Sequence, residues 1–395
     1  MAAARGQQRV ALATVWDGVP DYACAVLHWC QHAQRLGRLL EQDVGVQSVD
    51  LHMLLSAEHA YQGKTRSARS MVLPGGKALP SQGCRCKHRF CPECVHAETA
   101  DDGFNPPPET TVAEDCPNMK IWRPEQRLRR AIESFSTRRN GGCKGGWSTG
   151  MLYKWWAVSL TDYALVILSD LDVQLLRLDQ PSEIVAARWR AGWNTVVPSS
   201  RTPRVLGSKD FVSPLNGGLW MLSWPSGKMY EDGLSQLEVA KYNKSHGFSL
   251  VGTPQDLYER YPLVRPMMNK SRMYTHNTWD IPFGDCDQGF LFYMFYLRNY
   301  GTGLAHEPAP KMCRKYVNRN NASCAHTATH YWGHRKPWIF DIDNKVGVLH
   351  YLKQTDYRHM VNRSHCARRF SRWAERLSTS RKSPPKYVGK LQRVL

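Results

Sequence analysis

The hydrophobic pattern near the start of the chain changes from strand-like to helical and back. Val10–Val15 is a short, continuous apolar run, and Val49–Leu55 is a second one. Between them, the segment Tyr22–Leu40 has apolar residues at helical spacing, namely Ala25, Val26, Trp29, Leu36, Leu39 and Leu40. A strand, a helix and a second strand in this order predict a βαβ unit and a parallel sheet.

Three stretches further along extend this pattern. Tyr163–Leu168 is the clearest strand of the sequence, because its run is continuously apolar, as expected for a strand buried on both faces. Phe211–Leu222 is another apolar stretch, interrupted by Asn216-Gly217-Gly218, and Asp287–Asn299 predicts a helix with large apolar residues. We therefore expect an α/β fold, with a mixed sheet flanked by helices.

The pattern breaks between Gln62 and Pro124, where Gly, Pro, Cys and charged residues dominate. This stretch is too long for a simple connection, and we assign residues 62–142 to a Cys-rich insertion within one domain that spans residues 8–355. A helix is expected near its end, because Pro124 suits a first helical turn and the apolar residues after it share one face. These residues are Leu128, Ile132 and Phe135.

The net charge of the 395-residue chain is +19, although its 42% hydrophobic and 22% charged residues argue against wholesale disorder. Much of the excess of basic over acidic residues lies between Arg358 and Arg393, a stretch with a single acidic residue, Glu375. Residues 356–395 are therefore interpreted as a basic tail, for which disorder is one expectation. Three explanations of the net positive charge stay open: the protein binds nucleic acid, it binds an anionic donor or acceptor, or it has a solvated basic surface without a partner.

The sequence has no apolar run of about 18 residues, so we expect no membrane span. The short N-terminus before Val10 leaves no room for a secretory signal, which favours a cytoplasmic protein, or a Golgi-lumenal one if an upstream anchor is missing. Four Asn-x-Ser tripeptides would fit a lumenal enzyme with disulfides, but such tripeptides arise readily by chance. They begin at Asn243, Asn269, Asn321 and Asn362.

Twelve cysteines is a high number for a cytosolic chain, and four of them crowd together in the insertion. These four are Cys84, Cys86, Cys91 and Cys94. Four thiolates at such short spacing could hold a structural Zn²⁺. Disulfides or free thiols are the alternatives. A zinc-finger nucleic-acid binder would rest on this insertion and the charge alone.

Two carboxylates, Asp170 and Asp172, follow the strand that ends at Leu168. Open α/β sheets bind ligands at the carboxyl ends of their strands, and residues two apart in a strand point to the same side. Both carboxylates could therefore approach one hard cation, which in turn could hold a diphosphate. The alternative is a pair of acids in a turn, since the D-x-D pattern is common by chance.

A second cluster of polar types lies between His330 and Trp338. An imidazole at His330 could supply a third metal ligand, and Gly333 would admit a phosphate close to the backbone. Lys336 would place a positive charge beside the same phosphate. The alternative for a single histidine is a hydrogen-bonded core residue, but the whole arrangement is unusual.

Taken in order along the chain, these blocks resemble the glycogenin-like glycosyltransferases, the family 8 retaining enzymes with a GT-A fold. The hallmark His-x-x-Gly-x-x-Lys-Pro-Trp of that family is matched from His330 to Trp338, and a Lys-x-x-x-Trp-x-Leu-like approach to its D-x-D is mirrored by Lys154–Leu160. Leu215–Leu219 and Asp287–Leu291 mirror its Asn-Ser-Gly and Asp-Gln-Gly stretches. Two departures stand out: the N-terminal Thr-Asn-x-x-Tyr pattern is not cleanly present, and Gly217 replaces the serine.

The resemblance implies a GT-A (Rossmann-like) catalytic domain that binds a UDP-sugar and Mn²⁺. It implies metal ligands at Asp170, Asp172 and His330. It implies catalytic residues near the anomeric carbon and the acceptor path at Asp287 and Gln288. It implies donor contacts at Thr14, Trp16, Lys154, Asp170, Leu171, Asn216, Gly217, Gly333 and Lys336.

The expected activity is transfer of a hexosyl group from a UDP-sugar to a hydroxyl acceptor, which could be a saccharide, a lipid, a polyol or a protein. Retention would come from front-face attack, or from a covalent intermediate on Asp287. The rival hypothesis is a non-catalytic GT-A-like protein whose basic tail and Cys-rich insertion bind nucleic acid or protein. We expect no nucleic-acid partner for the enzyme and leave a homodimer open.

Overall fold

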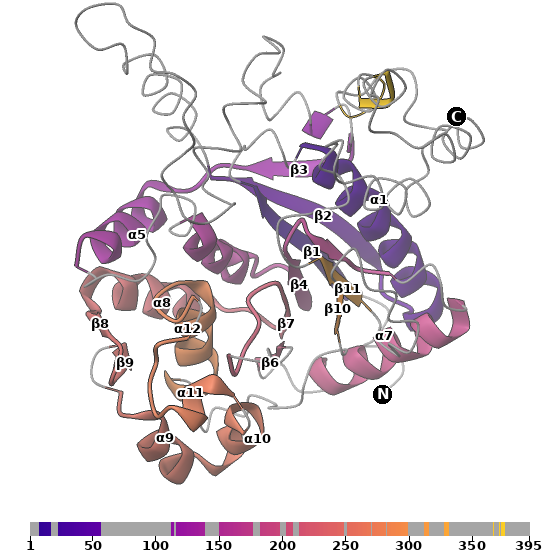
Figure 1. Ribbon diagram of the computed structural model, residues 1–395. Coiled ribbons are helices and arrows are strands. Elements are labelled where there is room, and N and C mark those ends of the chain that lie inside the picture. Colours follow the sequence, from indigo (N-terminus) through magenta and orange to yellow (C-terminus); the bar gives the residue numbers. More distant parts are fainter. Residues whose placement is uncertain are drawn as a thin grey trace, which may run out of the picture.

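The computed structural model describes most of an α/β domain (Figure 1). The described residues are 8–16, 23–56, 112–113, 116–138, 150–176, 182–197, 203–207, 213–248, 251–269, 271–281, 283–298, 312–315, 328–331, 366, 371 and 373–375. All structural statements below refer to these residues.

A six-stranded sheet in the order β3-β2-β1-β4-β7-β6 forms the centre of the molecule. Its strands are β1 (Arg9–Trp16), β2 (Ser48–Leu55), β3 (Met119–Trp122), β4 (Leu165–Ser169), β6 (Arg204–Gly207) and β7 (Leu219–Ser223). The strands β3, β2, β1 and β4 are parallel, whereas β7 is antiparallel to both β4 and β6. The sheet is therefore mixed, as predicted.

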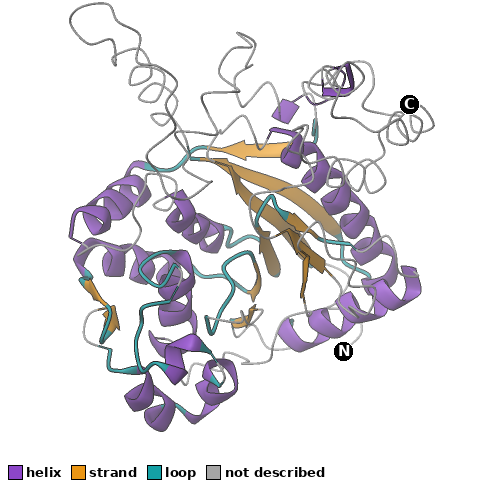
Figure 2. Ribbon diagram, in the orientation of Figure 1, coloured by secondary structure: helices purple, strands orange, loops and turns teal. Residues whose placement is uncertain are grey.

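Helices cover both faces of the sheet (Figure 2). The helices α1 (Ala23–Leu39) and α7 (Ser182–Val196) pack with one core cluster. The helices α5 (Gln126–Arg138), α8 (Gly227–Val239), α12 (Asp287–Phe292) and a 3₁₀ helix, Met151–Ser159, pack with the other. Alternation along β1 explains why both clusters form, because Val10 and Leu12 face the first cluster while Ala11 and Ala13 face the second.

Smaller elements complete the described fold. A second sheet has the order β10-β11-β5 and a third has β8-β9. Their strands are β5 (Val173–Gln174), β8 (Tyr242–Asn243), β9 (Gly247–Phe248), β10 (Met312–Lys315) and β11 (Ala328–Tyr331). The remaining helical segments are α9 (Pro254–Arg260), α10 (Arg265–Met268), α11 (Arg272–Thr275), a 3₁₀ turn at Pro262–Val264, and π-helical segments at Leu40–Val44 and Tyr293–Arg298. None of the described helices is both long enough and apolar enough to cross a membrane.

Part of the stretch that was assigned to the insertion, residues 62–142, forms regular elements of the described fold. Met119–Trp122 pairs in parallel with β2 as the edge strand β3, and Gln126–Arg138 forms α5, whose residues Leu128, Ile132 and Phe135 are buried. The elements β3 and α5 therefore belong to the layered core. The cysteines proposed to hold zinc, Cys84, Cys86, Cys91 and Cys94, lie outside the described residues.

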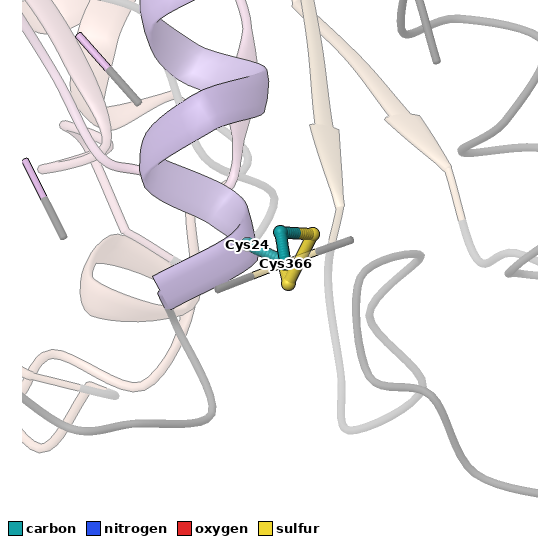
Figure 3. The surroundings of a disulfide bond; sticks show 2 residues. All are labelled: Cys24 and Cys366. Atoms are coloured by element: carbon teal, nitrogen blue, oxygen red, sulfur yellow. A yellow bond between two sulfur atoms is a disulfide. The ribbon is translucent and has the colours of Figure 1, made fainter. Parts of the chain in front are cut away.

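Helix α1 is enclosed by segments from distant parts of the chain. Its residues from Cys24 to Cys30 are all buried. Cys24 forms a disulfide with Cys366, 342 residues away, with a Cα–Cα distance of 5.1 Å (Figure 3). Cys30 forms a second disulfide with Cys116. The few described residues of the predicted basic tail, 356–395, thus include a buried, covalently attached cysteine.

Candidate active site

The two aspartates of the D-x-D pattern lie where β4 ends. Asp170 follows the last residue of β4 directly, and its backbone N–H donates to the carbonyl of Gly218, 2.8 Å away, at the start of the antiparallel neighbour β7. Asp172 immediately precedes the short strand β5. The carboxyl end of a buried strand and its antiparallel neighbour therefore define this edge.

His330 reaches the same edge through the second sheet. It lies in β11, which is antiparallel to β5 with His330 opposite Val173. Its Nε2 is 3.2 Å from Oδ1 of Asp172. Asp170, Asp172 and His330 each offer one ligand atom, and these atoms all lie within 4.8 Å of one another.

Lys154 connects this cluster to the start of α12. Its Nζ lies 2.7 Å from Oδ1 of Asp170 and 2.6 Å from Oδ2 of Asp287, and it donates to the carbonyl of Gly217 at 3.2 Å. The side chains of Lys154 and Asp287 are 6% and 2% exposed, respectively. The ammonium is thus enclosed by two carboxylates rather than open to a donor phosphate.

The loop Asn216–Gly218 packs tightly against the same residues. The Asn216 Oδ1 accepts the backbone N–H of Gly218 at 2.7 Å. A Cβ at Gly217 would overlap the Asp287 carboxylate, and a Cβ at Gly218 would lie 2.8 Å from Cε1 of His330. Glycine at both positions is therefore required for this close approach.

Asp287 and Gln288 begin α12, and both are buried. Oδ1 of Asp287 and Oε1 of Gln288 have no hydrogen-bond partner among the described residues. Buried acceptors are almost always hydrogen-bonded in folded proteins. These two atoms are therefore able to accept hydrogen bonds from a bound ligand.

The charged side chains of the site shift one another's pKa values. Burial raises the pKa of the Asp170 carboxyl, Lys154 opposes that shift, and Asp172 and Asp287 add to it. Burial lowers the pKa of Lys154, but Asp170 and Asp287 outweigh it and raise the pKa overall. Lys154 is therefore cationic at any physiological pH, and the remaining excess of negative charge favours a bound cation.

Three residues expected to contact the donor are buried at or near the same edge. Thr14 is fully buried near the end of β1, and its hydroxyl has no partner among the described residues. The side chains of Trp16 and Leu171 pack into the core cluster around α1.

The remaining donor residues, Gly333 and Lys336, lie outside the described part of the chain. Gly218 is the residue that sequence reasoning did not select for the site, although it contacts both Asn216 and His330. Gly218 could have been selected from the sequence, because it directly follows Asn216 and Gly217, which were selected.

The donor set fits a divalent cation. Two carboxylates and an imidazole nitrogen converge within 4.8 Å, and glycine at position 218 keeps side-chain atoms out of the space beside them. No protein-family model matches the sequence, and a search of curated proteins gave no match. What the site does therefore has to be inferred from its own residues.

Proposed function

We propose that the protein is a retaining glycosyltransferase that moves a hexosyl group from a UDP-sugar to a hydroxyl acceptor and depends on Mn²⁺. One observation carries the proposal: Asp170, Asp172 and His330 converge at the carboxyl end of β4, and Lys154 joins them to the buried carboxylate of Asp287. The mixed sheet with helices on both faces is compatible with a GT-A fold, which is part of the proposal.

The choice of metal follows from the ligand types. Two carboxylates with an imidazole suit Mn²⁺ better than Mg²⁺, which prefers oxygen ligands and water. When bound, the ion would stabilise the negative charge that develops on the departing diphosphate. Asp170, Asp172 and His330 are the residues that would hold it.

The residues of α12 are placed to bind hydroxyl groups. Oδ1 of Asp287 and Oε1 of Gln288 are buried acceptors, which can each accept a hydrogen bond from a sugar or acceptor hydroxyl. Lys154 holds the Asp287 side chain by donating to its other oxygen, Oδ2, at 2.6 Å. We favour front-face attack, in which the departing phosphate takes the proton of the acceptor, because this route needs no enzyme nucleophile.

The test is UDP release from a panel of UDP-sugars, with Mn²⁺ and with EDTA. We expect release from one sugar, dependent on Mn²⁺, and a loss of about 100-fold or more in Asp172→Asn, which removes one ligand charge while keeping the shape. The matched control is Asp232→Asn, because Asp232 pairs with Lys228 on the surface of α8.

Each outcome bears on the proposal. Equal release with EDTA, or full activity in Asp172→Asn, would contradict it. If the folded protein binds UDP with Mn²⁺ but releases none from any sugar in the presence of saccharide, lipid and polyol acceptors, the rival hypothesis of a non-catalytic binding protein is favoured.

A further inference from the structure

The described cysteines form a pattern that the candidate site does not use. Cys24 and Cys30 lie on α1 and form disulfides with Cys366 and Cys116, respectively; Figure 3 shows the first of these bonds. Cys286, directly before α12, is disulfide-bonded as well. Disulfides of this structural kind form and persist in oxidising compartments and are rare in the cytosol. The cysteine pairing therefore favours a secretory compartment over the cytoplasm expected from the N-terminal sequence.

In such a compartment, Asn-x-Ser tripeptides are acceptors for N-linked glycans. The first described tripeptide, Asn243-Lys244-Ser245, is at the turn of the hairpin β8–β9. Oδ1 of Asn243 accepts the backbone N–H groups of Ser245 and His246, at 3.0 and 2.7 Å. Both of these hydrogen bonds use the oxygen and not the amide nitrogen Nδ2, and the residue is half-buried.

The second described tripeptide begins at Asn269, which is exposed and ends the short helix α10. Its third residue, Ser271, is buried and caps α11 by accepting the backbone N–H of Tyr274. Asn269 and Ser271 thus stand at the end of α10 and at the start of α11. A glycan on Asn269 would extend into solvent without displacing core side chains.

Both asparagines lie on one part of the molecule. The hairpin β8–β9 and the helices α9, α10 and α11 form a lobe that lies well away from α1 (Figure 1). Neither asparagine belongs to the candidate active site.

We propose that the protein is a disulfide-bonded protein of the secretory compartment that carries N-linked glycans on Asn243 and Asn269. In the modification, Nδ2 of each asparagine forms a bond to the anomeric carbon of a lipid-diphosphate-linked oligosaccharide. The bond from that carbon to the phosphate oxygen breaks, the lipid diphosphate leaves, and Nδ2 loses one proton. This inference is independent of the proposed glycosyltransferase activity.

The experiment is peptide mass spectrometry of the protein purified from its own cells, without reduction and without prior deglycosylation. We expect the peptides containing Asn243 and Asn269 to carry sugar masses, and disulfide-linked peptides joining Cys24 to Cys366 and Cys30 to Cys116. Unmodified asparagine at both positions would overturn the proposal, and unmodified asparagine at one would overturn the assignment there. Free thiols at all four cysteines would overturn its basis.

Matched variants assign the sites individually when the chain is secreted from a eukaryotic host. Ser245→Ala should remove one glycan, whereas Ser245→Thr, which keeps the acceptor tripeptide, should retain it. Asn269→Gln should remove the other glycan, whereas Ser271→Thr keeps both the tripeptide and a hydroxyl that can cap α11. A mobility unchanged in Ser245→Ala and Asn269→Gln would contradict the assignment, even if UDP-sugar turnover is normal.

Discussion

At the scale of single residues, Lys154 determines whether the charges of the candidate site are balanced. Its ammonium contacts Asp170 and Asp287, and both Lys154 and Asp287 are almost fully buried. Removing one member of a buried ion pair leaves a charge without compensation, which is far more costly than losing a surface pair.

We therefore predict that Lys154→Met lowers the free energy of unfolding by about 3–5 kcal/mol at pH 8. The loss should be smaller at pH 5, because the orphaned carboxylates can then take up protons. Urea denaturation of the wild type and the variant at pH 8 and at pH 5 measures this loss in the free energy of unfolding. Lys228→Met, which breaks only the exposed pair with Asp232, should change stability little. Equal effects of the two variants would refute the role assigned to Lys154.

A second residue, His52, makes stability depend on pH. Trp122 donates to its Nδ1 at 2.9 Å, so Nε2 carries the proton and meets the Tyr163 hydroxyl at 2.8 Å. Burial, assisted by the charge of Lys120, lowers the pKa of His52 to about 4. The imidazole is therefore neutral in the folded protein at pH values where the unfolded chain already binds a proton.

The sign of the effect follows from this lowered pKa. The stabilisation is complete above the unfolded pKa of about 6.5 and is lost as the pH falls toward 4. Between pH 7 and pH 5, His52 should account for a loss of about 2 kcal/mol in the free energy of unfolding. This loss should be absent in His52→Gln, which can keep both hydrogen bonds. A loss of the same size in both proteins would show that other groups are responsible.

At this scale, much of the candidate site could be inferred before the structure. Asp170, Asp172 and His330 were selected as metal ligands from their types and spacing, and they do come together. What could not be inferred is which way a side chain points. The sequence did not indicate that the side chains of Leu171 and Trp16, both predicted to contact the donor, pack into the core cluster around α1, where burial of their apolar surface stabilises the fold.

At the scale of elements, the loop before β7 shows how the site is held together. Gly217 lies so close to Asp287 that a Cβ would overlap its carboxylate, whereas a Cβ at Gly227, at the start of α8, would meet nothing within 4 Å. We predict that Gly217→Ala lowers stability by about 1–3 kcal/mol, because the loop or α12 has to move. Gly227→Ala should have little effect or stabilise slightly. Thermal denaturation compares them, and similar melting temperatures for the two variants would contradict the tight packing.

The disulfide between α1 and Cys366 makes a prediction of its own. It closes a loop with a sequence separation of 342, and cross-links of this kind usually stabilise by about 2–5 kcal/mol. The double variant Cys24→Ser/Cys366→Ser should lose stability in this range. Guanidinium denaturation with and without reductant provides the control, because reductant should weaken the wild type more than the variant. No difference between the two proteins would mean that the bond is not formed.

Several of the longer elements were predicted, whereas the helices α7 and α8 and the shortest strands were not. Continuous apolar runs identified β1, β2 and β4, and helical spacing identified α1, α5 and the region of α12. The strand β5 has only two residues, and its pairing with β11 comes from a contact between segments more than 150 residues apart. The edge strand β3 was assigned to the insertion, because a strand of four residues, one buried and three exposed, carries little periodic signal.

At the scale of the whole molecule, the sequence indicated an α/β domain with a mixed sheet, which the structure confirms. It did not indicate that the C-terminal region returns to α1, since the pairing of cysteines depends on the fold and not on their spacing. The buried Cys366 and Trp373 belong to the hydrophobic core cluster that contains α1. The net charge of +19 is therefore not carried by a wholly separate tail.

The central claim is that the cluster at the end of β4 binds a nucleoside diphosphate through a divalent cation. The most direct measurement is the affinity for UDP by titration calorimetry, with Mn²⁺ and with EDTA, in the wild type, Asp172→Asn and Asp232→Asn. It requires neither the acceptor nor the correct sugar. We predict tight binding only with Mn²⁺, weakened about tenfold or more in Asp172→Asn and unchanged in Asp232→Asn. Equal affinity with EDTA, or no weakening in Asp172→Asn, would contradict the claim.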